Sequence, residues 1–275
     1  MFDYDPKVPL DVEEVRVEIK DGIKIHDISY ISPLGGRVSA YLVVPDWQCL
    51  LAGVILQHGL PGGRDRLLFQ AMNLAKAGAV SLLIDAPFAR PENRNRAAGD
   101  ITFTERDRDE QIQLIIDLRR GVDLLSSRAD VDASRIAYIG RSYGAAIGGL
   151  LAGIEKRIKT YILAVGDGGL VTHFAGSDDK TGVFWLLPEA QQQRWLAVME
   201  PIEPIRHIGN STPASLFFQA ALHDQAIPQI HAVDFYEAGG EPKKIKWYDA
   251  DHSLNEEAYR NQIEWLQSQI GLGFS

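Results

Sequence analysis

Cysteine is almost absent from this chain, which has 275 residues and a single cysteine, Cys49. One thiol excludes an internal disulfide and any metal site built from several cysteines, and it suits a reducing compartment. Long apolar segments are missing as well: no stretch of about 18 apolar residues occurs, so nothing predicts a membrane span. The first ten residues, MFDYDPKVPL, lack the basic and apolar regions of a signal peptide. We therefore expect a soluble, cytoplasmic protein.

Positive charge is also in short supply, with 28 Lys and Arg against 37 Asp and Glu and a formal net charge of −9. Such an acidic chain argues against nucleic acid or an anionic membrane as the main partner. A small-molecule substrate is expected instead, and self-association into a homo-oligomer stays open. Hydrophobic residues make up 45% of the chain, which excludes disorder and provides for a large core.

The pattern of apolar residues changes near Pro45. Before it, apolar and polar residues alternate in three segments that predict antiparallel strands, at 15–19, 23–28 and 38–44. After it, strands are continuously apolar and alternate with helices, which indicates a parallel sheet covered on both faces. These strands are expected at 52–57, 80–84, 135–139, 160–165, 215–219 and 244–247. The helices are expected at about 65–77, 105–126, 143–152, 229–237 and 255–270.

One segment, 167–210, interrupts this alternation. It is rich in turn formers and aromatic residues, and we interpret it as an insertion, a lid or cap of short helices, within one domain that spans 1–275. No Pro/Ser-rich linker divides the chain into two domains. A helix from Glu105 is predicted to begin at Thr104 as N-cap, with Asp107 placed to bond an exposed backbone amide.

The clearest motif is Gly140-Arg141-Ser142-Tyr143-Gly144, between a predicted strand and a predicted helix. This G-x-S-x-G pattern is typical of a nucleophile elbow, where a serine on a strained turn projects clear of its neighbours. Ser142 is therefore the candidate nucleophile. The alternative, that Ser142 is merely a helix N-cap, does not explain a glycine two residues away on each side.

A serine hydroxyl needs a base to remove its proton, and His252 is the best candidate. It follows the last predicted strand, at the sheet edge where Ser142 also lies. The other histidines after Ser142 are expected to be structural or exposed to solvent: His173, His207, His223 and His231.

The histidine in turn needs a carboxylate, and we assign Asp224, which follows the strand at 215–219. Asp249 and Asp251 are rival acids, but Asp251 adjoins His252 and is badly placed to reach its ring. The chain order Ser142, Asp224, His252 is the order of the α/β-hydrolase triad.

Two backbone amides must face the developing oxyanion. One comes from Tyr143, directly after the nucleophile, and the other from Leu60 in the loop Gln57-His58-Gly59-Leu60-Pro61-Gly62-Gly63. His58 is expected to shape this loop rather than to act as a second base.

Taken together, His58-Gly59, the elbow, Leu222-His223-Asp224 and Asp251-His252-Ser253 resemble the α/β-hydrolase superfamily. The likeness is to its serine branch of dienelactone hydrolases, acetyl xylan esterases and prolyl oligopeptidase-like enzymes, over about 51–266. It implies a mostly parallel sheet of about eight strands and ester or amide hydrolysis through an acyl-enzyme. Dienelactone hydrolases have cysteine where this chain has Ser142, and the chain has no room for the β-propeller of prolyl oligopeptidases.

Specificity is harder to predict. Phe174, Trp185 and Trp195 in the insertion are candidate substrate-binding residues of a lid, or anchors that hold the insertion in place or form a subunit contact. A loop after the strand at 80–84 carries three arginines that could meet a substrate carboxylate or belong to a solvated mixed-charge loop, namely Arg90, Arg94 and Arg96.

The sequence predicts a serine carboxylesterase that uses no cofactor and no metal. An acylaminoacyl or small-peptide hydrolase is the alternative, and a non-catalytic ligand-binding protein of the same fold is a more remote one.

Overall fold

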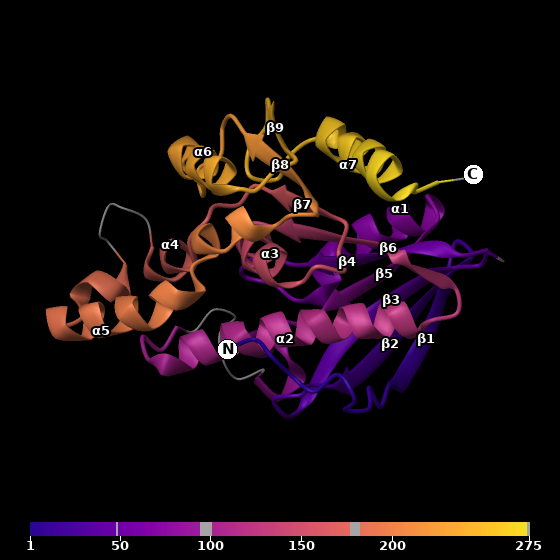
Figure 1. Ribbon diagram of the computed structural model, residues 1–275, viewed down its shortest axis with the longest axis horizontal. Coiled ribbons are helices and arrows are strands. Elements are labelled where there is room, and N and C mark those ends of the chain that lie inside the picture. Colours follow the sequence, from indigo (N-terminus) through magenta and orange to yellow (C-terminus); the bar gives the residue numbers. More distant parts are fainter. Residues whose placement is uncertain (48, 94–100, 177–181, 274–275) are drawn as a thin grey trace.

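The computed structural model describes residues 1–47, 49–93, 101–176 and 182–273. One mixed sheet runs through this part of the chain, and it has nine strands in the order β1-β2-β3-β5-β4-β6-β7-β8-β9 (Figure 1). The strands are β1 (Glu13–Lys20), β2 (Ile23–Ile31), β3 (Arg37–Pro45), β4 (Leu51–Gln57), β5 (Ala79–Ile84), β6 (Val131–Arg141), β7 (Thr160–Ala164), β8 (Ser215–Ala221) and β9 (Lys243–Tyr248).

The direction of the strands changes where the sequence pattern changes. Strands β1, β2 and β3 pair antiparallel with one another, and β3 pairs antiparallel with β5. From β5 to β9 every pair is parallel. The alternating segments thus form the antiparallel side and the continuously apolar ones the parallel side, as predicted. The sheet has one strand more than the eight that the family resemblance implied.

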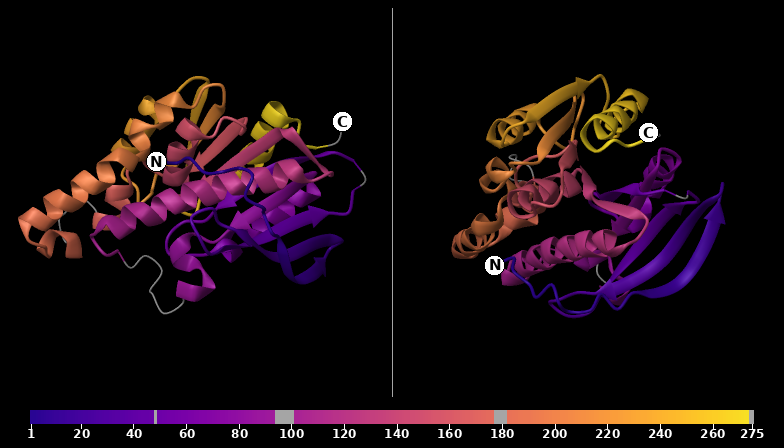
Figure 2. Two further views of the ribbon diagram at one scale, coloured as in Figure 1. Left: turned by 60° about the horizontal axis from the view of Figure 1, so that its bottom comes forward. Right: turned by 45° about the vertical axis from the view of Figure 1, so that its right-hand side comes forward.

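Helices cover both faces of the sheet. Apolar residues of α1 (Leu68–Lys76) and α7 (Glu256–Ile270) pack on one face. On the other face lie α2 (Glu105–Ser127), α3 (Tyr143–Ile154) and α6 (Gln229–Ala238). Figure 2 shows these two layers with the sheet between them. The helix predicted at 65–77 begins with a 3₁₀ turn (Arg64–Leu67) before α1.

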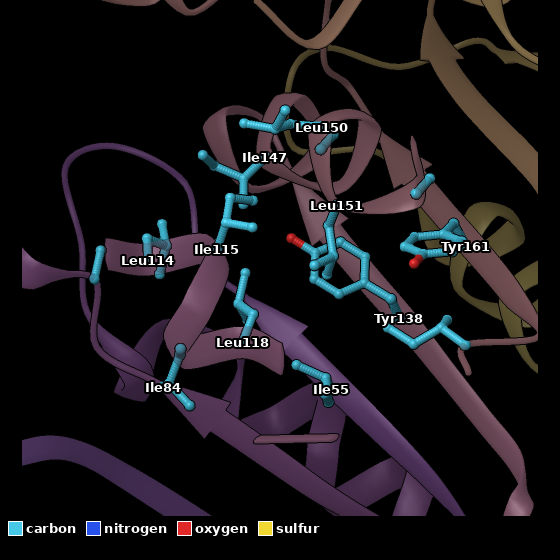
Figure 3. Close-up of a cluster of buried hydrophobic side chains, with 14 of the residues drawn as sticks. Ile55, Ile84, Leu114, Ile115, Leu118, Tyr138, Ile147, Leu150, Leu151 and Tyr161 are labelled. Atoms are coloured by element: carbon cyan, nitrogen blue, oxygen red, sulfur yellow. The ribbon is translucent and has the colours of Figure 1, made fainter. Parts of the chain in front are cut away.

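The larger core lies between the sheet and the pair α2 and α3, as Figure 3 shows. Ile55 and Tyr138 from the strands face Leu118 of α2 and Leu151 of α3 in this view. Gly148 lets α3 approach the sheet closely, because a Cβ there would lie 2.5 Å from the ring of Tyr138. The elbow at the start of α3 is therefore fixed to a rigid support.

The parallel strands end at one edge of the sheet. Strands β4, β6, β8 and β9 run in the same direction, so the loops that follow them meet at their carboxyl ends. Ligands of open α/β sheets bind at this edge. The fold therefore brings together the segments that carry Leu60, Ser142, Asp224 and His252.

The described part of the insertion contains two helices, α4 (Leu170–Ala175) and α5 (Glu189–Met199), and several 3₁₀ turns. In Figure 1, α5 lies at the left, beyond the end of the sheet and beside the start of α2. Trp195 of α5 is 1% exposed, and its indole N–H donates to Oδ2 of Asp107 at 2.8 Å. The rings of Phe103 and Phe184 each lie 5.2 Å from its ring. Aromatic packing thus joins the insertion to the segment before α2, and the bond to Asp107 joins it to the helix itself.

The start of α2 matches its prediction in part. The side chain of Thr104 accepts a hydrogen bond from the amide of Arg106, which confirms the N-cap. The carboxylate of Asp107 accepts from the amides of Thr102 and Phe103, upstream of the cap, and from Trp195. Asp107 therefore connects the segment before the helix to the insertion.

Among the helices of the described residues, none combines the length and the apolar character that a membrane span requires.

Candidate active site

The G-x-S-x-G segment forms a sharp turn between β6 and α3. Ser142 has φ +54° and ψ −122°, a conformation that costs a residue with a side chain roughly 1–3 kcal/mol and persists only where the surroundings enforce it. No residue with a side chain fits at either glycine of the motif. A Cβ at Gly140 would lie 2.1 Å from the carbonyl oxygen of Gly144. One at Gly144 would lie 2.2 Å from the carbonyl oxygen of Gln57. Ser142 is therefore held at the tip of a close crossing of strand, helix and loop.

The ring of His252 is hydrogen-bonded to Asp224. Its Nδ1 lies 3.0 Å and 2.9 Å from the two carboxylate oxygens of Asp224. The same carboxylate accepts from the amides of Ala226 at 2.8 Å and Ile227 at 3.0 Å, which fix its position after β8. The Asp224 side chain is 3% exposed, whereas that of His252 is 30% exposed. The acid thus lies behind the histidine, which is open to the cavity.

The environment of Asp224 favours its charged form. Burial alone would raise the pKa of this carboxyl, but the hydrogen bonds from His252, Ile227 and Ala226 outweigh burial and hold the pKa below its usual value. Asp224 is therefore a carboxylate over the neutral pH range. Such a group fixes the Nδ1–H tautomer of the histidine and leaves Nε2 free to accept a proton.

The rival acids have other partners. Asp249 lies 2.8 Å from Nε2 of His223, and both side chains are exposed. Asp251 accepts a hydrogen bond from the amide of Ser253 at 2.7 Å, in a local turn. The structure pairs His252 with Asp224 and with neither of these acids.

Ser142 and His252 line one cavity of about 390 Å³. Arg141, the second residue of the elbow, also lines it, and its Nη2 donates to the carbonyl oxygen of His252 at 2.7 Å. This bond joins the turn that carries Ser142 to the loop that carries His252, two segments far apart in the sequence. The sequence analysis did not predict this bond, because the variable positions of a G-x-S-x-G motif say nothing about their partners.

The expected oxyanion amides are available at this cavity. Tyr143 is the first residue of α3, so its amide has no partner in the helix. Leu60 lines the cavity, and no hydrogen bond within the described residues uses its amide. Gly59 brings this loop against Ser142, since a Cβ there would lie 3.1 Å from Cβ of Ser142.

His58 holds in place the loop after β4, which carries Gly59 and Leu60. Its Nδ1 donates to the carbonyl oxygen of Gly59 at 2.9 Å, and its Nε2 accepts from the amide of Ala86 at 3.2 Å. Burial lowers the pKa of this imidazole, so the ring is neutral, as these two bonds require. The structure agrees with the expectation that His58 shapes the loop.

The aromatic residues proposed to bind substrate lie elsewhere. Phe174 is buried with its ring 5.9 Å from that of Tyr143, and Trp195 is buried against α2. Trp185 is half-buried with its ring 5.0 Å from that of Phe184. None of the three is among the residues that line the cavity beside Ser142. For Trp195, burial and the bond to Asp107 favour the anchoring alternative, and substrate contact by Phe174 and Trp185 remains a prediction.

Of the three arginines for which a substrate contact or a solvated mixed-charge loop was predicted, Arg90 fits neither alternative. Arg90 is buried and forms an ion pair with the fully buried Asp117, so it is part of the core and not of a solvated loop or an anion site. Arg94 and Arg96 lie outside the described residues. The arginines that do line the cavity are Arg66 and Arg141, which the sequence had not singled out.

The described residues contain no group of three or more His, Cys, Asp or Glu side chains placed to hold a metal ion. The candidate site is thus built from a serine on a strained turn, a histidine with its carboxylate and two backbone amides, all at one edge of the sheet.

No protein-family model and no curated protein matches the sequence. Solved structures resemble it closely in fold. An acetyl xylan esterase from Paenibacillus sp. R4 has a TM-score of 0.79 at 20% identity, over 95% of this chain and 89% of that chain. Acetyl xylan esterase 1 from Thermoanaerobacterium sp. JW/SL YS485 has a TM-score of 0.74 at 15% identity, over 95% and 88%. A cold-adapted esterase from an Arctic intertidal metagenomic library has 0.69 at 15%, over 93% and 98%.

These neighbours and the sheet topology show that the chain has the α/β-hydrolase fold, as the sequence motifs implied. At such low identity the likeness concerns the fold, and the chemistry must be argued from the site itself.

Proposed function

We propose that this protein is a serine hydrolase that cleaves carboxylic esters through an acyl-enzyme. One observation carries the proposal: His252 is paired with the buried carboxylate of Asp224 and shares a cavity with Ser142, which sits on a strained turn. A nucleophile, a base and a group that orients the base form the arrangement that activates a serine hydroxyl. The esterases among the structural neighbours agree with this class of reaction.

In the first half of the reaction, Oγ of Ser142 attacks the carbonyl carbon of the ester while Nε2 of His252 takes its proton. The carbonyl oxygen becomes an oxyanion, which accepts hydrogen bonds from the amides of Leu60 and Tyr143. The carbonyl then re-forms, the bond to the alkoxy oxygen breaks, and His252 gives its proton to the departing alcohol.

In the second half, His252 takes a proton from a water molecule, whose oxygen attacks the acyl-serine. The same amides hold the second oxyanion. The bond to Oγ breaks, the proton returns to Ser142 and the carboxylic acid leaves. Asp224 keeps its negative charge throughout and stabilises the imidazolium that forms in each half.

Hydrolysis of p-nitrophenyl acetate by the purified protein and by Ser142→Ala tests this proposal. We expect turnover by the wild type and a loss of about 10⁴-fold or more in kcat for the variant, because the nucleophile is removed. Ser268→Ala, an exposed hydroxyl of α7, is the matched control and should keep the wild-type rate. Full activity of Ser142→Ala would contradict the proposal.

Two further measurements separate the alternatives. If matched amides are cleaved faster than esters, the protein is an acylaminoacyl or small-peptide hydrolase. If a fluorophosphonate probe does not label Ser142 in the folded protein, the site binds a ligand without turning it over.

A further inference from the structure

A groove leads away from Ser142 between α1 and α7. Its walls form a second cavity of about 490 Å³ that shares Arg66, Leu67 and Arg141 with the cavity beside Ser142. Figure 1 and the right-hand view of Figure 2 show the two helices side by side on this face of the sheet. The shared residues make the groove an extension of the candidate active site.

Two arginines at the junction of these cavities have no acid beside them. No carboxylate of the described residues lies within ion-pair distance of Arg66 or Arg141. The guanidinium of Arg141 donates to two neutral oxygens, the carbonyl of His252 and, at 3.5 Å, the hydroxyl of Tyr259. The side chain of Arg66 is exposed in the groove and makes no hydrogen bond within the described residues.

This local excess of positive charge is unusual for the molecule. The chain carries a net charge of −9, and arginines such as Arg90, Arg119 and Arg157 are paired with acids. Glu256 and Arg260 also line the groove and lie 3.8 Å from each other, an exposed and weak pair. The unpaired charge therefore lies on Arg66 and Arg141, the two arginines that line both cavities.

The groove also offers apolar surface. Phe69 of α1 is 80% exposed and Tyr259 of α7 is 39% exposed, and both line the second cavity. An aromatic or aliphatic body would lie against these rings, while a guanidinium holds a carboxylate through two parallel N–H bonds. Arginine and aromatic side chains together favour an amphipathic anion.

We propose that the groove between α1 and α7 binds a carboxylate carried by the ester substrate, and that Arg66, assisted by Arg141, selects for it. This inference rests on the proposed function, because it names the substrate class of the same site. Arg66 is the specificity residue. Arg141 also supports the histidine loop, so its substitution would disturb catalysis as well as binding.

Two pairs of substrates locate the carboxylate on the acyl or on the alcohol side of the ester. The first pair is p-nitrophenyl butyrate and mono-p-nitrophenyl succinate, which differ by a methyl and a carboxylate at the end of the acyl chain. The second pair is methyl 4-acetoxybenzoate and 4-acetoxybenzoate, which differ on the leaving group. We expect kcat/KM at low salt to favour the anionic member of one pair, and the preference to shrink as salt screens the charges.

Arg66→Gln should lower the ratio of anionic to neutral kcat/KM about tenfold, mainly through KM, because a charge-assisted hydrogen bond is lost. Arg66→Lys keeps the charge without the planar fork and should keep part of the preference. Arg16→Gln removes an exposed charge on the edge strand β1 and should leave the ratio unchanged.

The results separate this inference from the proposed function. Hydrolysis of the neutral esters that depends on Ser142, without preference for either anionic ester, would overturn the inference alone. An anionic preference that survives Arg66→Gln intact would overturn the role of Arg66. No hydrolysis of any of the four esters, with no labelling of Ser142, would overturn the proposed function.

Discussion

Two regions at the carboxyl edge of the sheet are held in place by different forces. The turn that carries Ser142 is fixed by its backbone, because Gly140 and Gly144 lie where no Cβ fits. The insertion at 167–210 is fixed in its described part by side chains, above all by Trp195 against Phe103, Phe184 and Asp107. A backbone constraint leaves a short motif in the sequence, whereas an aromatic contact can be made by many sequences. The comparison predicts that damage to the site around the turn removes activity, and that a Cβ added at its glycines also destabilises the fold. Damage to the insertion should lower stability and leave the chemistry unchanged.

The largest effect on activity is expected at Asp224, the acid that is hydrogen-bonded to His252. Asp224→Asn should lower kcat for p-nitrophenyl acetate by about 10⁴-fold, because the amide no longer fixes the tautomer of His252 or stabilises its charged form. Asp249→Asn is the matched control, since that exposed carboxylate pairs with His223, and it should keep its activity. Equal losses in both variants would contradict the assignment of Asp224.

A methyl group at the elbow should damage the fold itself. Gly144→Ala places a Cβ 2.2 Å from the carbonyl oxygen of Gln57, so the loop after β4 must move. We expect the free energy of unfolding to fall by more than about 4 kcal/mol, measured by chemical denaturation. Gly22→Ala, at a turn with φ +77° and open space around it, should cost only about 1 kcal/mol. Similar losses at the two glycines would show that contact at the elbow is not the decisive constraint.

The insertion should respond in stability rather than in chemistry. Trp195→Ala removes a buried aromatic ring, and the free energy of unfolding should fall by about 3–5 kcal/mol. Trp195→Phe keeps most of the packing and loses the bond to Asp107, at a cost of about 1–2 kcal/mol. In Trp195→Phe, KM for p-nitrophenyl butyrate should stay at its wild-type value. A rise in KM without a loss of stability would instead assign Trp195 to the substrate.

The smallest effect is a pH dependence of stability in the insertion. Burial of Glu203, with Asp167 nearby, raises its pKa from 4.5 to about 7, although the amide of Val171 donates to it at 3.0 Å. A raised carboxyl pKa means that the folded protein holds a proton that the unfolded chain has lost. The contribution of Glu203 to stability is therefore present below about pH 4.5 and is lost as the pH rises towards 7.

Glu203→Gln should remove this loss. Its free energy of unfolding, relative to wild type, should rise by about 2 kcal/mol between pH 4.5 and 7.5. Glu200→Gln is the matched control, because that carboxylate is exposed in the same segment and pairs with Arg206. If the difference between Glu203→Gln and wild type does not change with pH, Glu203 is ionised in the folded protein.

Much of this architecture could be predicted because its causes are local. Alternating and continuous apolar segments gave the antiparallel and parallel sides of the sheet, and Thr104 was recognised as an N-cap from its neighbours alone. The expected bonding of Asp107 was only partly right, since its indole partner lies 88 residues further along the chain. The arginines at 90, 94 and 96 were singled out by position along the sequence, which says nothing about burial. Arg90 proved to be a core ion pair, while Arg66, on the helix side of a glycine-rich loop, faces the cavity.

The sequence by itself determined the order of strands and helices and the place of Ser142, Asp224 and His252 after strands that end at one edge. These follow from the period of the apolar residues, the restricted conformation of a G-x-S-x-G turn and the direction of parallel strands. Only the tertiary structure decided which carboxylate meets His252, that Arg141 joins the elbow to the histidine loop, and that Arg66 stands in the groove without an acid beside it. Distances of a few ångströms between segments far apart in the chain set these partners, and no local pattern of residues records such distances.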